Sequence, residues 1–415
     1  MTTILLQVPA AGDDDGPGHL VPSVYGAFVA GALVLSLAAA LGIVLLRKGV
    51  LRRRSGTSGY FAGAVAVAVL AATAVVVWPA GPEPAAGGRG TPLLSRIRLG
   101  GSSVPVTVVP NRPGVNLVGI GAADASAGPD RGRLTAGRAH AGSAQTWVTV
   151  RLPAGRSTVW VSARGTTSPV AVDTGEDRGR TLTALRGPDG PECAAAAVGA
   201  VLAGDDRPLD ACPADRLAPG DAAALRSVVD FLADRGERGV ALVGDDSPRA
   251  VAAADVVRAA ARRAGLEVTR PGTARHPLIV VAGWATGAQA VEGVAAGRTP
   301  AQGTYLAPWL LTPSLLQPAA GQIVPLRYAP RGTEVSGYLN ALSERLPGEP
   351  PAAAGYEAWQ QARGTTGDAP VRLYAVAVPY VPGSGGSGHV HHLKRADWLP
   401  GGMIIPVAAP GRRTA

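Results

Sequence analysis

The stretch GVALVGDDSP, residues 239–248, decides the fold of the C-terminal half of this chain. Its apolar first half is typical of a buried strand, and Ser247 followed by Pro248 is a helix-start signal. That helix is predicted to end at Gly265, where residues 266–268 begin another strand. A strand, a helix and a strand in this order predict a parallel sheet covered by helices.

The same alternation continues on both sides of this stretch. Further strands are predicted at 278–281, 304–306 and 323–326, and further helices at 221–232 and 288–296. Residues 176–380 are therefore assigned to one α/β domain. In open sheets of this kind, ligands bind in the loops at the carboxyl ends of the strands.

This domain resembles the type-I periplasmic substrate-binding proteins, the family that delivers branched-chain amino acids and amides to transporters. The resemblance rests on residues 240–247, 281–284, 303–309, 338–350 and 354–359. Proteins of that family close two similar lobes over a ligand. The resemblance implies that this chain supplies essentially the second lobe, because residues 175–235 are too few for a first one.

By analogy with that family, four residues at strand carboxyl ends are candidates for contact with a small polar ligand: Asp246, Ser247, Trp284 and Tyr305. A different interpretation is that they cap helices and pack in the core.

In residues 93–175 the spacing of apolar residues changes to a period of two. Short apolar runs occur at 104–108, 115–120, 147–152, 158–162 and 169–172. Short strands separated by Gly, Pro and Asn turns predict an antiparallel β-sandwich. The stretch 104–116, which ends in PNRPGVN, resembles part of the immunoglobulin-like domains of actinobacterial copper-resistance membrane proteins. Those domains hold copper through His and Met, whereas this segment has His140 and no methionine.

Two uncharged stretches near the N-terminus, residues 25–46 and 60–78, are long enough to span a membrane as helices. Residues 1–24 would form a tail, 47–59 a loop and 79–92 a linker. Because the loop holds Arg47, Lys48 and Arg52 to Arg54, the positive-inside rule predicts a cytoplasmic loop with both termini outside. Buried core helices and a signal peptide are the alternatives, and a signal peptide would need a basic start that this chain lacks.

The predicted fold class is thus multidomain: two transmembrane helices, an antiparallel β-sandwich and an α/β domain, in a two-pass cell-membrane protein. The 415 residues carry a net charge of +9, but only Lys48 and Lys394 are lysines. Apart from the basic loop, most of the positive charge is interpreted as scattered surface arginine, so no nucleic-acid partner is predicted.

Cys193 and Cys212, the only cysteines in the sequence, exclude a four-thiolate zinc site. Outside the cytoplasm they would form a disulfide; free thiols or a redox pair are the alternatives, although Cys-x-x-Cys spacing is absent.

A second chemical feature follows a Gly/Ser run in the C-terminal segment 381–415. His389, His391 and His392 could hold copper or zinc, since two imidazoles of His-x-His fall on one face of a strand. Unliganded surface histidines are the alternative.

No nucleophile elbow, no phosphate-binding glycine loop, no His-Glu-x-x-His and no Gly-x-Gly-x-x-Gly after a predicted strand occurs. The leading hypothesis is a membrane-tethered extracytoplasmic protein that binds a small molecule or a metal. One alternative is an envelope enzyme or accessory factor in specialised-metabolite biosynthesis or copper handling. Another is a structural docking partner of a transporter or sensor.

Overall fold

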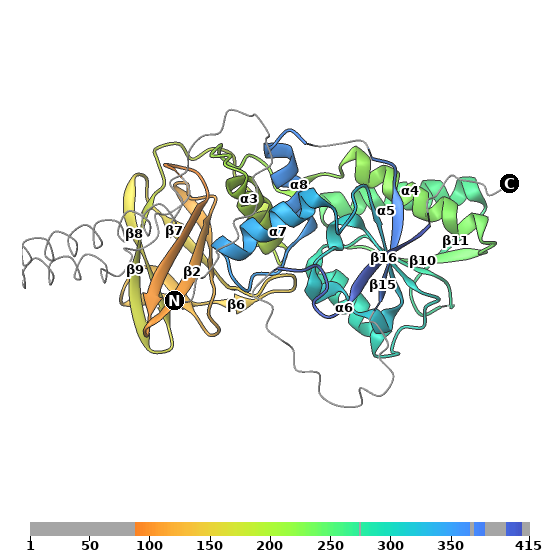
Figure 1. The fold of residues 1–415 in the computed structure, drawn as a ribbon, viewed down its shortest axis with the longest axis horizontal. Coiled ribbons are helices and arrows are strands. Elements are labelled where there is room, and N and C mark those ends of the chain that lie inside the picture. Colours follow the sequence, from red (N-terminus) through yellow and green to blue (C-terminus); the bar gives the residue numbers. More distant parts are fainter. Residues whose placement is uncertain (1–87, 274, 366–368, 378–395, 409–415) are drawn as a thin grey trace, which may run out of the picture. The chain divides into compact units, whose positions relative to one another are not determined.

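A computed structural model describes residues 88–273, 275–365, 369–377 and 396–408, all within one compact unit, Pro82–Ala415 (Figure 1). The α/β domain follows the antiparallel sheets in chain order.

Two antiparallel sheets form the first part of the described chain. One has the spatial order β1 (Leu93–Leu99), β2 (Ser102–Val109), β3 (Gly114–Ile120), β7 (Thr146–Leu152) and β6 (Arg138–Ala139). The other has the order β5 (Arg133–Ala136), β4 (Ser126–Asp130), β8 (Arg156–Ala163) and β9 (Thr166–Asp173). Alternate side chains of β2 and β8, including Val106 and Val161, are fully buried in a shared core, as expected for a sandwich.

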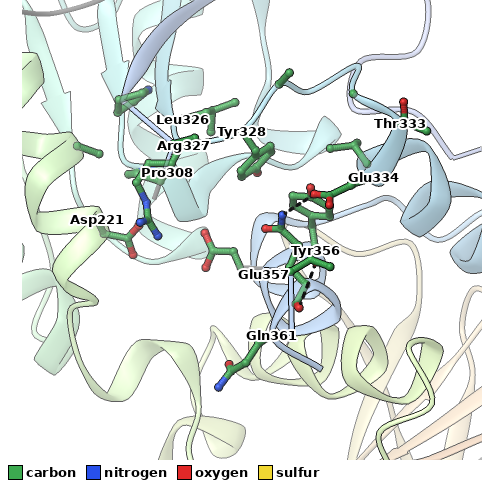
Figure 2. Close-up of a pocket in the computed structure, with 18 residues that line it drawn as sticks. Asp221, Pro308, Leu326, Arg327, Tyr328, Thr333, Glu334, Tyr356, Glu357 and Gln361 are labelled. Atoms are coloured by element: carbon green, nitrogen blue, oxygen red, sulfur yellow. Dashed lines mark hydrogen bonds between the residues drawn. The ribbon is translucent and has the colours of Figure 1, made fainter. Parts of the chain in front are cut away.

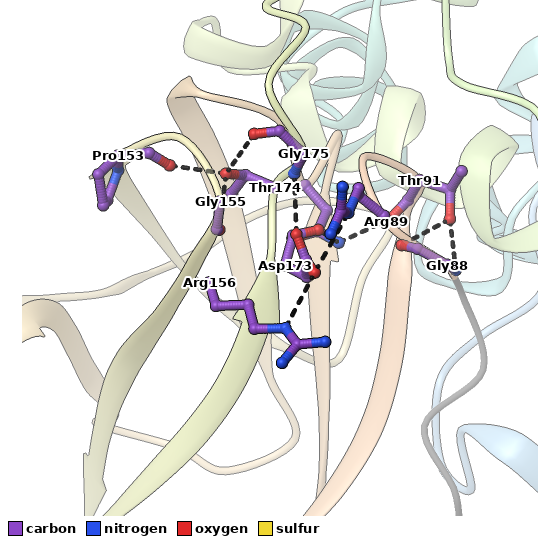
Figure 3. A network of polar contacts seen from close by, with 10 residues as sticks. Gly88, Arg89, Thr91, Pro153, Gly155, Arg156, Asp173, Thr174 and Gly175 are labelled. Carbon is purple, nitrogen blue, oxygen red and sulfur yellow. Dashed lines mark hydrogen bonds and ion pairs between the residues drawn. The ribbon is translucent and has the colours of Figure 1, made fainter.

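The end of β9 is tied to the turn between β7 and β8 by polar contacts (Figure 3). Asp173 accepts a hydrogen bond from the Gly175 N–H at 3.1 Å and lies within 3.5 Å of Arg89 and Arg156. The Gly175 N–H and the two arginines hold the pKa of Asp173 below its usual value. The Thr174 hydroxyl donates to the Pro153 carbonyl at 2.6 Å, which fixes the turn.

A helical segment follows the sandwich: η1 (Thr183–Arg186), α3 (Gly190–Leu202) and η2 (Pro213–Asp215). The predicted disulfide between Cys193 and Cys212 is present, with a Cα–Cα distance of 4.9 Å, and it joins α3 to η2. Closing a loop of this size stabilises a fold by roughly 3 kcal/mol in the chain-entropy model.

One mixed sheet has the spatial order β11 (Glu267–Thr269), β10 (Gly239–Val243), β12 (Leu278–Val280), β13 (Thr304–Leu306), β14 (Gln322–Leu326), β15 (Arg372–Ala377) and β16 (Met403–Ala408). The first five are parallel; β15 runs antiparallel to β14 and β16 antiparallel to β15. From β10 the chain first passes to β11, on one side of β10, and then returns to form β12 on the other side of β10. That reversal is the place where open α/β sheets form a crevice.

Helices cover both faces of this sheet. Right-handed crossovers running in opposite directions place α5 (Pro248–Ala264) and α6 (Trp284–Ala295) on opposite faces (Figure 1). The remaining helical elements are α4 (Pro219–Asp234), η3 (Pro308–Leu310), η4 (Pro313–Leu315), η5 (Pro318–Ala320), α7 (Thr333–Arg345) and α8 (Ala353–Ala362). As predicted, Ser247 caps α5, and Gly265 ends it at φ 71°.

The predicted fold class and the two-pass localisation are corrected by one finding. In the part of the chain that the structure describes, no helix is long and apolar enough to cross a membrane. The 17 residues of α5 would measure about 25 Å, short of a hydrocarbon core of about 30 Å. The stretches 25–46 and 60–78 themselves lie outside the described residues, as does the basic loop between them.

Candidate functional site

A cavity of about 600 Å³ lies where β13 and β14 end (Figure 2). Pro308 follows β13, whereas Arg327 and Tyr328 follow β14. The start of α4, the start of α7 and one side of α8 complete the wall. Because strand carboxyl ends meet at one edge of a parallel sheet, residues far apart in the sequence converge here.

Asp221 enters this cavity from the first turn of α4, where the helix dipole favours a carboxylate. Only 8% of the residue is exposed. Burial raises the pKa of Asp221 to about 6, although the charges of Arg249 and Arg327 oppose the shift. Figure 2 shows the Arg327 side chain directed toward Asp221.

Glu357 reaches the same cavity from α8 and faces Asp221 in Figure 2. Burial, together with the negative charge of Asp221, raises the pKa of Glu357 to about 8. Two acids with raised pKa values therefore share one cavity, and a third, Glu334, lies at its exposed side.

Two aromatic rings form another part of the wall. Tyr328 and Tyr356 meet edge to face, with centroids 4.6 Å apart. The Tyr328 hydroxyl is buried and has no hydrogen-bond partner among the described residues. An unpartnered buried hydroxyl costs stability, so this group is available to a ligand or a bound water.

A second cavity, of about 420 Å³, shares Asp221, Glu357 and Gln361 with the first. Its wall includes Glu192 and Arg249. The two residues pair through two contacts of 2.6 Å, and both side chains are almost completely buried. Asp221 and Glu357 thus lie where the two cavities meet.

Arg249 also lies 4.4 Å above the Trp309 ring, a cation–π contact. Burial by itself would lower the pKa of Arg249. The charge and hydrogen bonds of Glu192, with smaller effects of Asp221 and Asp189, raise it instead.

The four residues predicted to contact a ligand lie elsewhere. Asp246 is exposed, and Ser247 caps α5 by accepting the Ala250 N–H at 3.3 Å. The buried Trp284 ring donates from Nε1 to the Trp309 carbonyl at 3.1 Å, and Tyr305 is buried in β13. None of the four lines the two cavities, so their contact with a ligand stays a prediction.

His389, His391 and His392 lie outside the described residues. Within the described ranges, no group of three or more His, Cys, Asp or Glu could hold a metal ion. The predicted copper or zinc site therefore stays a prediction for the C-terminal segment.

Sequence reasoning missed the residues that do line the cavity. The sequence predicts only that a helix starts at Asp221, and it assigns no role to Arg327 and Tyr328. The signal that could have found them is position, because they directly follow the strand predicted at 323–326. Glu357 lies within α8 and only the packing of that helix brings it to the sheet, so no local pattern could reveal it.

No family model matches this chain, and no curated protein matches it. Part of the chain is similar to solved structures of solute-binding proteins. One, from an ABC transporter of R. palustris in complex with benzoate, shows 11% identity over 34% of this chain and a TM-score of 0.30. This chain spans 46% of that protein's length.

Two more solved structures are of the same class. A branched-chain amino acid ABC transporter periplasmic ligand-binding protein from Burkholderia xenovorans LB400 shows 11% identity over 52% of this chain and 75% of its own, with a TM-score of 0.32. An ABC transporter substrate-binding protein from Desulfitobacterium hafniense in complex with Leu shows 13% identity over 44% and 73%, with a TM-score of 0.26. The copper-resistance resemblance and the actinobacterial origin stay predictions.

Proposed function

We propose that the α/β domain binds a small polar molecule that carries an amino group, in the cavity at the ends of β13 and β14. One observation carries the proposal: the unpartnered Tyr328 hydroxyl shares a cavity of about 600 Å³ with the carboxyl groups of Asp221 and Glu357. That volume is within the usual range for small-molecule sites.

Charge supports an amine rather than an acid as the ligand. Asp221, Glu334 and Glu357 outnumber Arg327 among the charged residues of the wall. The rings of Tyr328 and Tyr356 add faces to which an ammonium group is attracted. A bound cation would favour the charged forms of Asp221 and Glu357, so binding releases protons from them.

The disulfide supports a location in an oxidising compartment. Small-molecule binding outside the cytoplasm, beside a transporter or sensor that receives the ligand, is therefore part of the proposal.

The test is a screen of small primary amines against carboxylates of matched size, followed by calorimetric titration of the best amine. We expect amines to bind preferentially, and Glu357→Gln to weaken binding by about tenfold or more. Affinity should rise between about pH 6 and about pH 8, as the carboxyl groups lose their protons. Glu267→Gln, a change at an exposed residue of β11, is the matched control.

Equal binding of amines and acids, or unchanged affinity in Glu357→Gln, would contradict the proposal.

An enzyme is the second candidate, because acids with pKa values of about 6 and about 8 in one cavity suit proton transfer near neutral pH. Mass spectrometry of the recovered amine separates the two: a binding protein returns it unchanged, and an enzyme does not.

A further inference from the structure

A third cavity, of about 320 Å³, lies at the end of the sandwich and has an unusual lining. Its charged lining residues are five arginines: Arg112, Arg151, Arg178, Arg180 and Arg186. No Asp or Glu is among the described residues that line it. This cavity shares no lining residue with the two described above.

The turn that carries Arg112 is held by two buried asparagines. Asn116 Oδ1 accepts the N–H groups of Asn111 and Arg112 at 2.7 and 3.2 Å. Asn116 Nδ2 donates to the carbonyl of Arg112 at 2.7 Å, and Asn111 Nδ2 donates to the Thr91 carbonyl at 2.8 Å. The backbone on both sides of Arg112 is therefore fixed before any ligand arrives.

The Arg112 side chain is only 6% exposed, which is costly for a charge. It lies 3.4 Å from Asp210, a carboxylate that is itself 72% exposed. The guanidinium also packs against the backbone of Gly179, where a Cβ would come within 1.9 Å of Nη1. At φ 55° this position also favours glycine, so the structure leaves space here for the arginine.

The other four arginines are exposed and come from β7, from the segment that leads to η1 and from the last residue of η1. Within the described ranges, their side chains make no ion pair, hydrogen bond or cation–π contact. The nearby Asp173 is paired with Arg89 and Arg156 instead (Figure 3). Like charges around one cavity repel each other, and a bound anion would remove that repulsion.

We propose that this arginine cavity binds the phosphate group of a small molecule. Guanidinium groups match phosphate oxygens through paired hydrogen bonds, and several of them suit a dianion better than a single carboxylate. The walls are rigid on two sides, since Asn116 fixes one turn and Thr174 fixes the other through Pro153. The arginines converge on a cavity rather than line a long groove, so the ligand is a small molecule and not a nucleic acid.

The test titrates the full-length protein by calorimetry, at constant ionic strength, with inorganic phosphate and with glycerol phosphate. We expect saturable binding, weakened about tenfold or more by Arg151→Gln or Arg180→Gln. Both residues are exposed, so neither change should alter the melting temperature. Tighter binding of glycerol phosphate identifies an esterified ligand, and equal binding identifies free phosphate; both support the site.

The matched control is Arg226→Gln, which removes an exposed arginine of α4 that lines none of the three cavities. It should leave phosphate affinity unchanged. The proposal is overturned if neither phosphate saturates, or if the control lowers affinity as much as the cavity variants do. Arg112→Lys retains the positive charge but removes the planar guanidinium with its paired N–H donors. Weaker phosphate binding with an unchanged melting temperature would support contact through the guanidinium.

Discussion

Glu192 and Arg249 form a buried ion pair in the wall of the second cavity, with two contacts of 2.6 Å. A buried pair is weak as a net source of stability, but removal of one partner leaves the other charged and unpaired. Arg249 would then keep the interactions with Asp221, Asp189, Asp245 and Glu357, none of which forms a hydrogen bond with it.

We therefore predict that Glu192→Gln lowers the free energy of unfolding by about 3–5 kcal/mol. Denaturant titration of both proteins measures this. Glu292→Gln is the matched control, since it breaks an exposed pair with Arg298 and should cost less than about 1 kcal/mol. If both variants lose a similar free energy of unfolding, burial of the ion pair does not determine the size of the loss.

Residue identity alone could predict only part of this chemistry. The disulfide was predictable because just two cysteines occur in the sequence, and the structure confirms it. The cap at Ser247 was predictable because its partner is three residues away. Glu192 and Arg249 are 57 positions apart, so only tertiary packing brings them together.

At the scale of elements, α3 and α8 approach closely through glycines. A Cβ on Gly199 would come within 1.9 Å of the Gly355 carbonyl oxygen. Because α8 carries Tyr356 and Glu357, the spacing of these helices sets where the cavity wall lies.

We predict that Gly199→Ala lowers the free energy of unfolding by about 1–3 kcal/mol, because the helices must separate. It should also weaken the binding of a primary amine, which calorimetry would detect. Gly337→Ala on α7 is the control: its Cβ would meet the Trp359 ring at an ordinary 3.4 Å. That change should be neutral or stabilising, since alanine favours a helix. A stable Gly199→Ala protein with unchanged binding would contradict the role of this contact.

Element boundaries were predictable where local signals set them. The start of α5 and its end at Gly265 agree with the sequence prediction. The next helix was predicted at 288–296, but α6 begins at Trp284. Its first N–H groups are satisfied by distant carboxylates: Asp245 accepts from Gly283 at 2.6 Å, and Asp189 from Ala285 at 3.2 Å. Because these capping groups come from other elements, no local sequence pattern predicts where the helix starts.

At the scale of the whole molecule, the fold buries several acids and thereby raises their pKa values. The pKa of Asp221 is about 6 and that of Glu357 about 8. Burial also raises the pKa of Glu349 to about 7, although Ser143 donates a hydrogen bond to it at 2.7 Å. All three values lie above those of the unfolded chain, so the folded state binds more protons.

The free energy of unfolding should therefore fall as the pH rises from about 4, where these acids lose their protons in the unfolded chain, to about 8. Glu357→Gln should remove part of this slope, by about 2 kcal/mol or more over that interval. Denaturant midpoints at a series of pH values measure both, with Glu267→Gln as the exposed control. Stability that rises with pH, or an unchanged slope in Glu357→Gln, would contradict this account.

Five arginines depart from the scattered distribution that was expected for most of the positive charge. Arg112, Arg151, Arg178, Arg180 and Arg186 line one cavity. They come from the turn between β2 and β3, from β7, from the segment before η1 and from η1 itself, so their proximity depends on the fold and not on spacing. The alternation of strands and helices predicted the sheet, but it did not predict which charged residues meet at its edges.

Asp221 and Glu357 belong to the walls of two cavities at once. A proton or a cation taken up on one side therefore alters the electrostatic potential on the other. By thermodynamic linkage, the two cavities cannot have independent affinities: whatever the first occupant does to the second, the second does equally to the first.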